Sequence, residues 1–190
     1  MGLLDAFFRK RKPPESKTEG LFAISTAQVT MEANLQIVSQ KKAGICFKPQ
    51  ASSHFEKARH EVEELLKLSS KETSTRYQVL KDDYGYVWIL LEDPEFEDLV
   101  SNIYLVSEGL LERGFGGQLL CAIFPFKKKK ESTVIYWVYS FKHGNFYPFA
   151  PMHSKERDSA LEFRMRSLME KELPIEKDVS RWYPLWDAPI

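Results

Sequence analysis

Apolar residues along the chain recur either at every second position or at every third and fourth position. Period two predicts strands, and the longer spacing predicts helices. Strands are expected over 29–38, 43–47, 76–80, 86–92, 118–126 and 132–141. Helices are expected between Ser53 and the Ser/Thr-rich break at 69–75, between Pro94 and Gly114, and over 154–171.

The order of these elements indicates one α+β domain. Short connections favour antiparallel pairing, with the helices on one face of the sheet. The expected fold is a mainly antiparallel sheet with about three helices packed on it. This arrangement is similar to the small α/β domains of secretion chaperones, a likeness of fold that identifies no function.

Two segments of this prediction depend on local composition. The strand over 29–38 is expected because Val29, Met31, Ala33, Leu35 and Ile37 alternate with polar residues. The segment KHGNFYPFAP at 142–151 is expected to be a loop, because glycine and proline interrupt it.

The string GFGG at 114–117 has two interpretations. A phosphate-binding loop needs a strand before it and a helix after it. The predicted order here is the reverse, with a helix before and a strand after. Gly114 is therefore expected to terminate the preceding helix.

Changes in composition divide the chain into three parts. Residues 1–12 form an amphipathic basic segment, and Pro13 and Pro14 prevent its helix from continuing. Residues 13–20 read as a polar linker. Residues 21–190 are expected to form the single α+β domain, which ends in an aromatic C-terminal tail.

The first twelve residues are a candidate contact with a membrane or a partner protein. In a helix, the apolar residues among them would share one side, and four cations follow directly. Each cation near an anionic membrane contributes about 1 kcal/mol, and apolar insertion adds to that. A helix docked on protein, or a frayed end, is the alternative. The candidate residues are Leu3, Leu4, Phe7, Phe8, Arg9, Lys10, Arg11 and Lys12.

Two aromatic segments, NFYPFAP at 145–151 and RWYPLWDAP at 181–189, are candidate partner-contact surfaces. Aromatic side chains supply a large contact area with few rotatable bonds. The same composition suits a tail that folds back over the core. The candidate contact residues are Phe146, Tyr147, Phe149, Trp182, Tyr183 and Trp186.

Composition narrows the function classes. The 27 basic and 27 acidic side chains cancel, which argues against general nucleic-acid binding. Cys46 and Cys121 lie far apart in sequence, without metal-ligand spacing, and are expected to be small buried thiols. No apolar run approaches the roughly 20 residues that span a bilayer. We expect a cytoplasmic protein without cofactor or metal, which is peripheral to the inner face of the membrane if residues 1–12 bind lipid.

Candidate chemistry is sparse. His143 and His153 flank the aromatic loop, and each has the chemistry of a general base. No Walker or G-x-S-x-G sequence accompanies them, so no catalytic residue is assigned. The basic run KKKK at 127–130 is expected at a hairpin tip, with contact to an anionic partner as the alternative.

Four strings carry a resemblance to a known family: MGLLDAFF at 1–8, GFGGQLLCAIFPF at 114–126, GNFYPFAP at 144–151 and RWYPLWDAP at 181–189. They resemble the PspA-associated protein PspAB family. The resemblance implies a link to the phage-shock response, in which the coiled-coil protein PspA supports damaged membranes. It also implies an association with membrane quality control, including HtpX-type proteases, and it supplies no catalytic residue.

Three functional hypotheses follow. The leading one is a non-enzymatic adaptor or regulator in envelope stress, which binds a PspA-like or membrane-protease-associated partner and the membrane surface. The second is a chaperone-like module that binds peptides at a sheet edge or an apolar groove. The third is an enzyme with a site at His143 and His153. The oligomeric state stays open.

Overall fold

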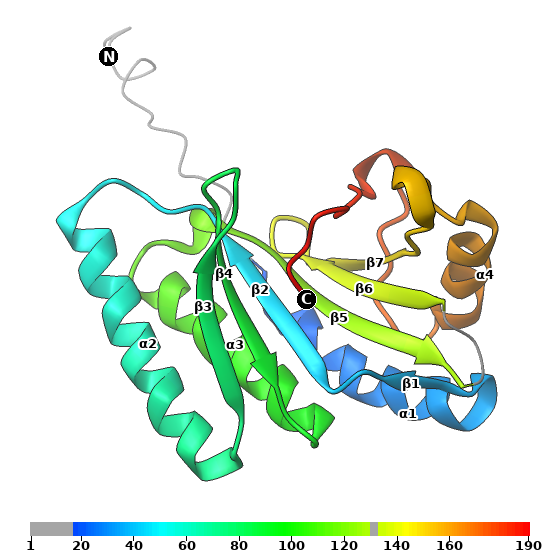
Figure 1. The fold of residues 1–190 in the computed structure, drawn as a ribbon, viewed down its shortest axis with the longest axis horizontal. Coiled ribbons are helices and arrows are strands. Elements are labelled where there is room, and N and C mark those ends of the chain that lie inside the picture. The colour runs from blue at the N-terminus through cyan, green and yellow to red at the C-terminus, as the bar shows by residue number, and fades with distance from the viewer. Residues whose placement is uncertain (1–16, 130–132) are drawn as a thin grey trace, which may run out of the picture.

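Seven strands form one antiparallel sheet in the computed structural model, which describes residues 17–129 and 133–190 (Figure 1). The order across the sheet is β3-β4-β2-β5-β6-β7, and β1 pairs with the end of β5. The strands are β1 (Ile37–Ser39), β2 (Lys42–Phe47), β3 (Arg76–Lys81), β4 (Val87–Glu92), β5 (Leu119–Lys128), β6 (Val134–Ser140) and β7 (Asn145–Phe149).

Helices cover one face of this sheet and one of its edges (Figure 1). α1 and α3 lie behind the sheet, α2 packs against α3, and α4 lies beside β7. The described helices are α1 (Ala23–Leu35), α2 (Ser53–Thr73), α3 (Phe96–Glu112) and α4 (Ser159–Met169). The α+β class and the antiparallel sheet predicted from sequence are confirmed, with about four helices in place of three.

The additional helix is α1, and the strand predicted over 29–38 is wrong for 29–35, whereas 37 and 38 lie in β1. The buried residues of α1, Ile24, Ala27 and Met31, follow helical spacing. Val29 and Ala33, which the alternating pattern placed inside, are exposed. The alternation was accidental, because the helical face begins upstream of the segment that showed it.

The predicted loop at 142–151 is wrong as well, because it contains β7. Pro148 lies opposite Trp137 of β6. A proline cannot donate a ladder hydrogen bond, and it is tolerated here because β7 forms the last full strand of the sheet. The helix expected over 154–171 is shorter than predicted and begins after Asp158, which accepts a hydrogen bond from the Leu161 amide at 2.9 Å.

The end of α3 confirms the prediction for Gly114. Its φ of +81° lies in the left-handed region, which glycine adopts without a Cβ penalty. The Gly114 amide donates to the Leu111 carbonyl at 2.9 Å, and the Phe115 amide donates to the Leu110 carbonyl at 2.8 Å. This pair of bonds is the Schellman motif, which ends the helix.

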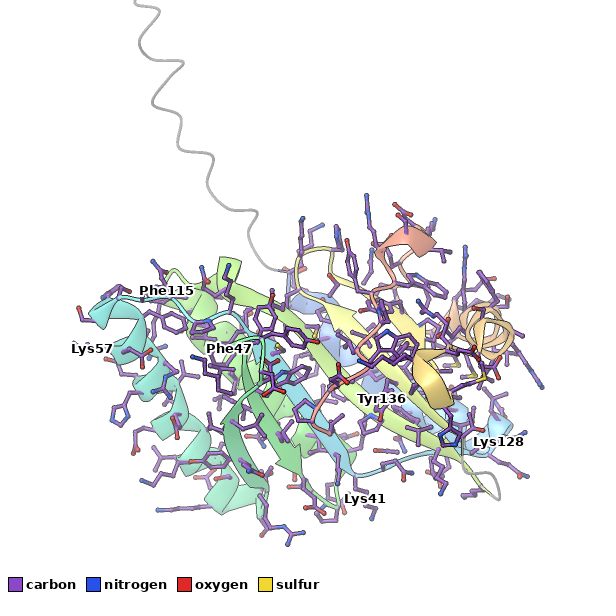
Figure 2. The ribbon with its side chains drawn as sticks, turned by 45° about the horizontal axis from the view of Figure 1, so that its top comes forward. Lys41, Phe47, Lys57, Phe115, Lys128 and Tyr136 are labelled. Carbon is purple, nitrogen blue, oxygen red and sulfur yellow. The ribbon has the colours of Figure 1, made fainter. Side chains whose placement is uncertain are left out.

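Alternation along the strands builds two apolar layers. Ile45 and Phe47 of β2 face the helices, whereas Cys46 between them faces the other side of the sheet. Phe47 and Phe115, labelled in Figure 2, lie near the start of α2, where both rings contact Phe55 at centroid distances of 6.3 and 5.0 Å. Burial of each such side chain contributes roughly 1.5–3 kcal/mol.

The second face of the sheet is covered by the C-terminal segment, which runs in front of β2 and β5 (Figure 1). Its layer combines strand residues with Trp182 and the half-buried residues Leu185, Trp186 and Ile190. None of the helices in the described part of the chain covers this layer, so any space left beneath the tail opens towards the surface.

The N-terminal boundary differs from the predicted linker. Residues 17–20 belong to the folded body: the Lys17 amide donates to the Phe141 carbonyl at 2.9 Å, and Thr18 is 5% exposed. The candidate membrane-contact residues 3–12 lie outside the described residues.

Candidate binding site

A cavity of about 800 Å³ lies between the helix-free face of the sheet and the C-terminal tail. Its floor consists of strand side chains, among them Cys46 of β2, Trp88 of β4, Cys121 of β5 and Tyr147 of β7. Tail residues 183–188 complete the wall. Five separate segments of the chain therefore build one largely apolar cavity.

Asp82, in the β3–β4 turn, shapes one side of the rim. Its Oδ1 accepts hydrogen bonds from the amides of Tyr84 at 3.0 Å and Tyr86 at 2.9 Å. Its Oδ2 accepts from the indole Nε1 of Trp88 at 2.9 Å. One carboxylate thus closes the turn and fixes the orientation of the tryptophan in the floor.

Large apolar side chains are exposed at the mouth. Tyr84 is 72% exposed, Tyr183 is 60% exposed and Leu120 is 38% exposed, and all three line the cavity. Scattered exposed apolar residues are normal, but a group around an apolar hollow is typical of an interaction site.

The basic side of the rim comes from the β6–β7 turn, where Lys142 and His143 line the cavity. Lys142 makes no ion pair with any residue in 17–129 or 133–190. The acidic rim residues are already engaged: Asp82 in the bonds above, and Asp187 in an ion pair with Lys155 at 3.4 Å. Lys142 is therefore a rim cation without an ion-pair partner among the described residues.

Hydrogen bonds hold the tail on the sheet. The Trp182 indole donates to the Glu176 carbonyl at 2.9 Å, and the Tyr147 hydroxyl donates to the Tyr183 carbonyl at 3.0 Å. Burial raises the pKa of Tyr147 well above its usual value, so this hydroxyl keeps the proton that it donates. The ring of Trp186 meets that of Phe149 edge-on at 5.0 Å.

A buried ion pair anchors the start of the tail to α4. Arg157 Nε donates to both carboxylate oxygens of Glu162, at 3.0 and 2.9 Å, and its Nη1 donates to the Trp182 carbonyl at 2.9 Å. Glu162 is 2% exposed and also accepts from the Ala150 amide at 2.9 Å. This cluster joins β7, α4 and the tail.

The six aromatic residues proposed as partner contacts have different roles in the fold. Phe146, Tyr147, Phe149 and Trp182 are buried, with at most 3% exposure, and the tail lies over the sheet. That docked position is the alternative drawn from the sequence. Tyr183 is exposed and Trp186 is half-buried, and both lie at the cavity.

The two candidate histidines lie at opposite ends of β7. His143 lines the cavity, whereas His153 begins a short 3-10 helix, is exposed and lies outside the lining. A strand rises about 3.4 Å per residue, so β7 separates them and they do not form one site. Within the described ranges, no cluster of three or more His, Cys, Asp or Glu side chains is arranged to hold a metal ion.

Sequence reasoning missed Asp82, Tyr84 and Leu120 as site residues, and it treated Cys46 and Cys121 separately. The two cysteines are direct partners across β2 and β5. Their strands were predicted, and period two places each cysteine on the opposite face from its neighbours. The pairing of β2 with β5 is the missing information, because strand order is not visible in a single sequence.

The fold and cavity define a class: an α+β domain with helices on one face of its sheet and an apolar cavity under a docked tail on the other. The chain belongs to the PspAB family, PspA associated protein B, whose family model matches residues 1–190. Neither a curated protein nor a solved structure matches it. None of the helices in the described part of the chain has the length and apolar character needed to cross a membrane.

Proposed function

We propose that this PspAB-family protein is a non-enzymatic adaptor that binds PspA through the mouth of the cavity. The family's name supplies the partner, since it denotes association with PspA. The observation that supports the contact site is the exposure of Tyr84, Leu120 and Tyr183 around an apolar hollow. Aromatic and aliphatic anchors at a hollow are typical of interface hot spots.

The cavity also suggests the chemistry of the contact. Its apolar floor suits one or two apolar side chains of the partner. Lys142 at the rim suits a carboxylate beside them, since it makes no ion pair with any residue in the described ranges. We therefore expect an apolar segment of PspA flanked by acidic residues.

The test is the affinity of the full chain for purified PspA from the same source. Leu120→Ala removes an anchor at the mouth. Leu65→Ala on α2 is its matched control, because Leu65 is 42% exposed and Leu120 is 38% exposed. A hot-spot anchor contributes about 2 kcal/mol, so we expect Leu120→Ala to weaken binding by more than about tenfold. Equal affinities for the two variants would place the contact elsewhere.

Tyr183→Ala is a second probe of the mouth. The side chain is 60% exposed, and the bond that holds this part of the tail uses the Tyr183 backbone carbonyl, which the substitution retains. Loss of affinity without loss of stability in urea unfolding is the expected result.

The membrane part of the proposal concerns residues 1–12. Their cations and apolar residues favour an anionic surface, and salt screens that attraction. We expect the intact protein to co-sediment with phosphatidylglycerol vesicles at low salt, and Phe7→Ser/Phe8→Ser to reduce this. The same substitutions should leave PspA affinity unchanged. Absence of vesicle binding by the intact protein would refute this part alone.

A peptide-binding chaperone is the second candidate, favoured by the position of β3. This strand ends the sheet, and within the described residues its outer edge pairs with no other strand. An extended peptide adds to such an edge through backbone bonds, with little sequence specificity. This candidate predicts saturable binding of unrelated extended peptides that Leu120→Ala does not change.

A further inference from the structure

Cys46 and Cys121 lie directly opposite each other on neighbouring antiparallel strands. Residues opposite each other in such a pair have Cα atoms about 4.5–5.5 Å apart. Disulfides form across Cα separations of about 4.4–6.8 Å. The backbone of β2 and β5 therefore already holds these two residues at a separation that a disulfide requires.

Both thiols also face the cavity. They project from the helix-free side of the sheet and line its floor, with Cys46 3% exposed and Cys121 9% exposed. Both are free cysteines. A water molecule occupies about 30 Å³ in the liquid, so a cavity of about 800 Å³ admits a solute of the size of hydrogen peroxide.

We infer that Cys46 and Cys121 form a reactive dithiol, which a peroxide entering the cavity converts to an intramolecular disulfide. This modification site goes beyond the adaptor function and does not depend on PspA binding. It requires one oxidant of a stated class, a hydroperoxide, and no movement of the strands.

The two sulfurs have different parts in the reaction. The hydrogen bond with Cys121 and burial raise the pKa of Cys46, so Cys46 holds its proton. The more exposed Cys121 sulfur therefore attacks the peroxide and gives up its proton. The O–O bond breaks, Cys121 becomes a sulfenic acid, and the departing oxygen leaves as water after taking up protons.

The second step closes the disulfide. The Cys46 sulfur attacks the Cys121 sulfur, the S–OH bond breaks, and the hydroxyl leaves as water with the Cys46 proton. In total the two thiols lose two electrons and two protons, and hydrogen peroxide is reduced to two molecules of water.

The experiment treats the full, reduced chain with one equivalent of hydrogen peroxide and records its intact mass without reductant. We expect a monomer lighter by two hydrogens, a peptide pair joining Cys46 to Cys121, and recovery of the original mass with dithiothreitol. Unchanged thiols, oxygen adducts without a disulfide, or disulfide-linked dimers would each overturn the inference.

Two variants test the order of the steps. Cys46→Ser leaves Cys121 without its partner, so we expect a sulfenic acid that dimedone traps. Cys121→Ser is expected to stay unmodified at the same dose of peroxide. If dimedone trapped a sulfenic acid on Cys46 in Cys121→Ser and none on Cys121 in Cys46→Ser, the assigned order of the two steps would be wrong.

A stability measurement on the unsubstituted chain is independent of how well the variants fold. The disulfide would close the loop between residues 46 and 121 and so restrict the unfolded chain. The peroxide-treated protein is therefore expected to unfold at a higher urea concentration than the reduced protein, and dithiothreitol should abolish the difference. Identical unfolding midpoints would show that no such cross-link had formed.

Discussion

Tyr139 and Tyr147 lie on opposite faces of the sheet, and burial raises the pKa of each hydroxyl. Tyr139 belongs to the layer under the helices, where its hydroxyl donates to the Lys17 carbonyl at 3.2 Å. Tyr147 belongs to the layer under the tail, where it donates to Tyr183. Each is a neutral donor that joins a terminal segment to the sheet.

Because the pKa of Tyr139 is raised to about 12, the folded state keeps this proton at a pH where the unfolded chain has lost it. Its contribution to stability is complete below the unfolded pKa of about 10 and declines as the pH rises above that value. Urea unfolding between about pH 8 and pH 11 should show this fall, which Tyr139→Phe makes shallower. Parallel curves for the two proteins would contradict the assignment.

Asp82 shows how much of a residue's role the sequence can reveal. The run Asp82-Asp83-Tyr84-Gly85 has the aspartate and glycine that favour a turn, and it connects β3 to β4. The bond from the Trp88 indole to Asp82 has no sequence signal, because it depends on which face of β4 the tryptophan occupies next to the turn.

At the scale of elements, contacts with α4 and β7 hold the C-terminal tail in place, in addition to the contacts of its own aromatic residues. Arg157 lies between the Glu162 carboxylate and the Trp182 carbonyl, and its guanidinium carbon lies 5.5 Å from the centre of the Phe149 ring. Removing one member of a buried pair leaves the other without compensation.

We therefore expect Glu162→Gln to reduce the free energy of unfolding by about 3 kcal/mol, the lower end of the range for buried pairs, because Arg157 is partly exposed. Replacing both Arg157 and Glu162 by leucine should destabilise the protein less than the sum of Arg157→Leu alone and Glu162→Leu alone. Urea unfolding of the four proteins measures the coupling. Strict additivity would mean that the pair does not anchor the tail.

The helices and strands that could be predicted from the sequence differ physically from those that could not. α2 and α3 show sustained helical spacing, and most of their apolar stripe is buried, although Leu65 of α2 is 42% exposed. α1 was missed because its buried face is narrow, with Ile24, Ala27 and Met31 as its buried residues. β7 was missed because an edge position allows the proline that excluded a strand from the prediction.

For the molecule as a whole, the two faces of the sheet are covered differently. The helices cover one face with the larger apolar layer, and the tail covers the other face incompletely, which leaves the cavity. The cavity brings together segments from residue 46 to residue 188, so its existence depends on strand order and tail position. Neither property can be read from the spacing of residues in one chain.

Amide hydrogen exchange of the full chain, with and without PspA, tests the central claim most directly. The adaptor account predicts that PspA slows exchange around Tyr84, Leu120, Lys142 and Tyr183, the four parts of the cavity mouth. The outer face of α2 should exchange at an unchanged rate. Protection confined to α1, α2 or the β3 edge, with the cavity mouth unaffected, would contradict the claim.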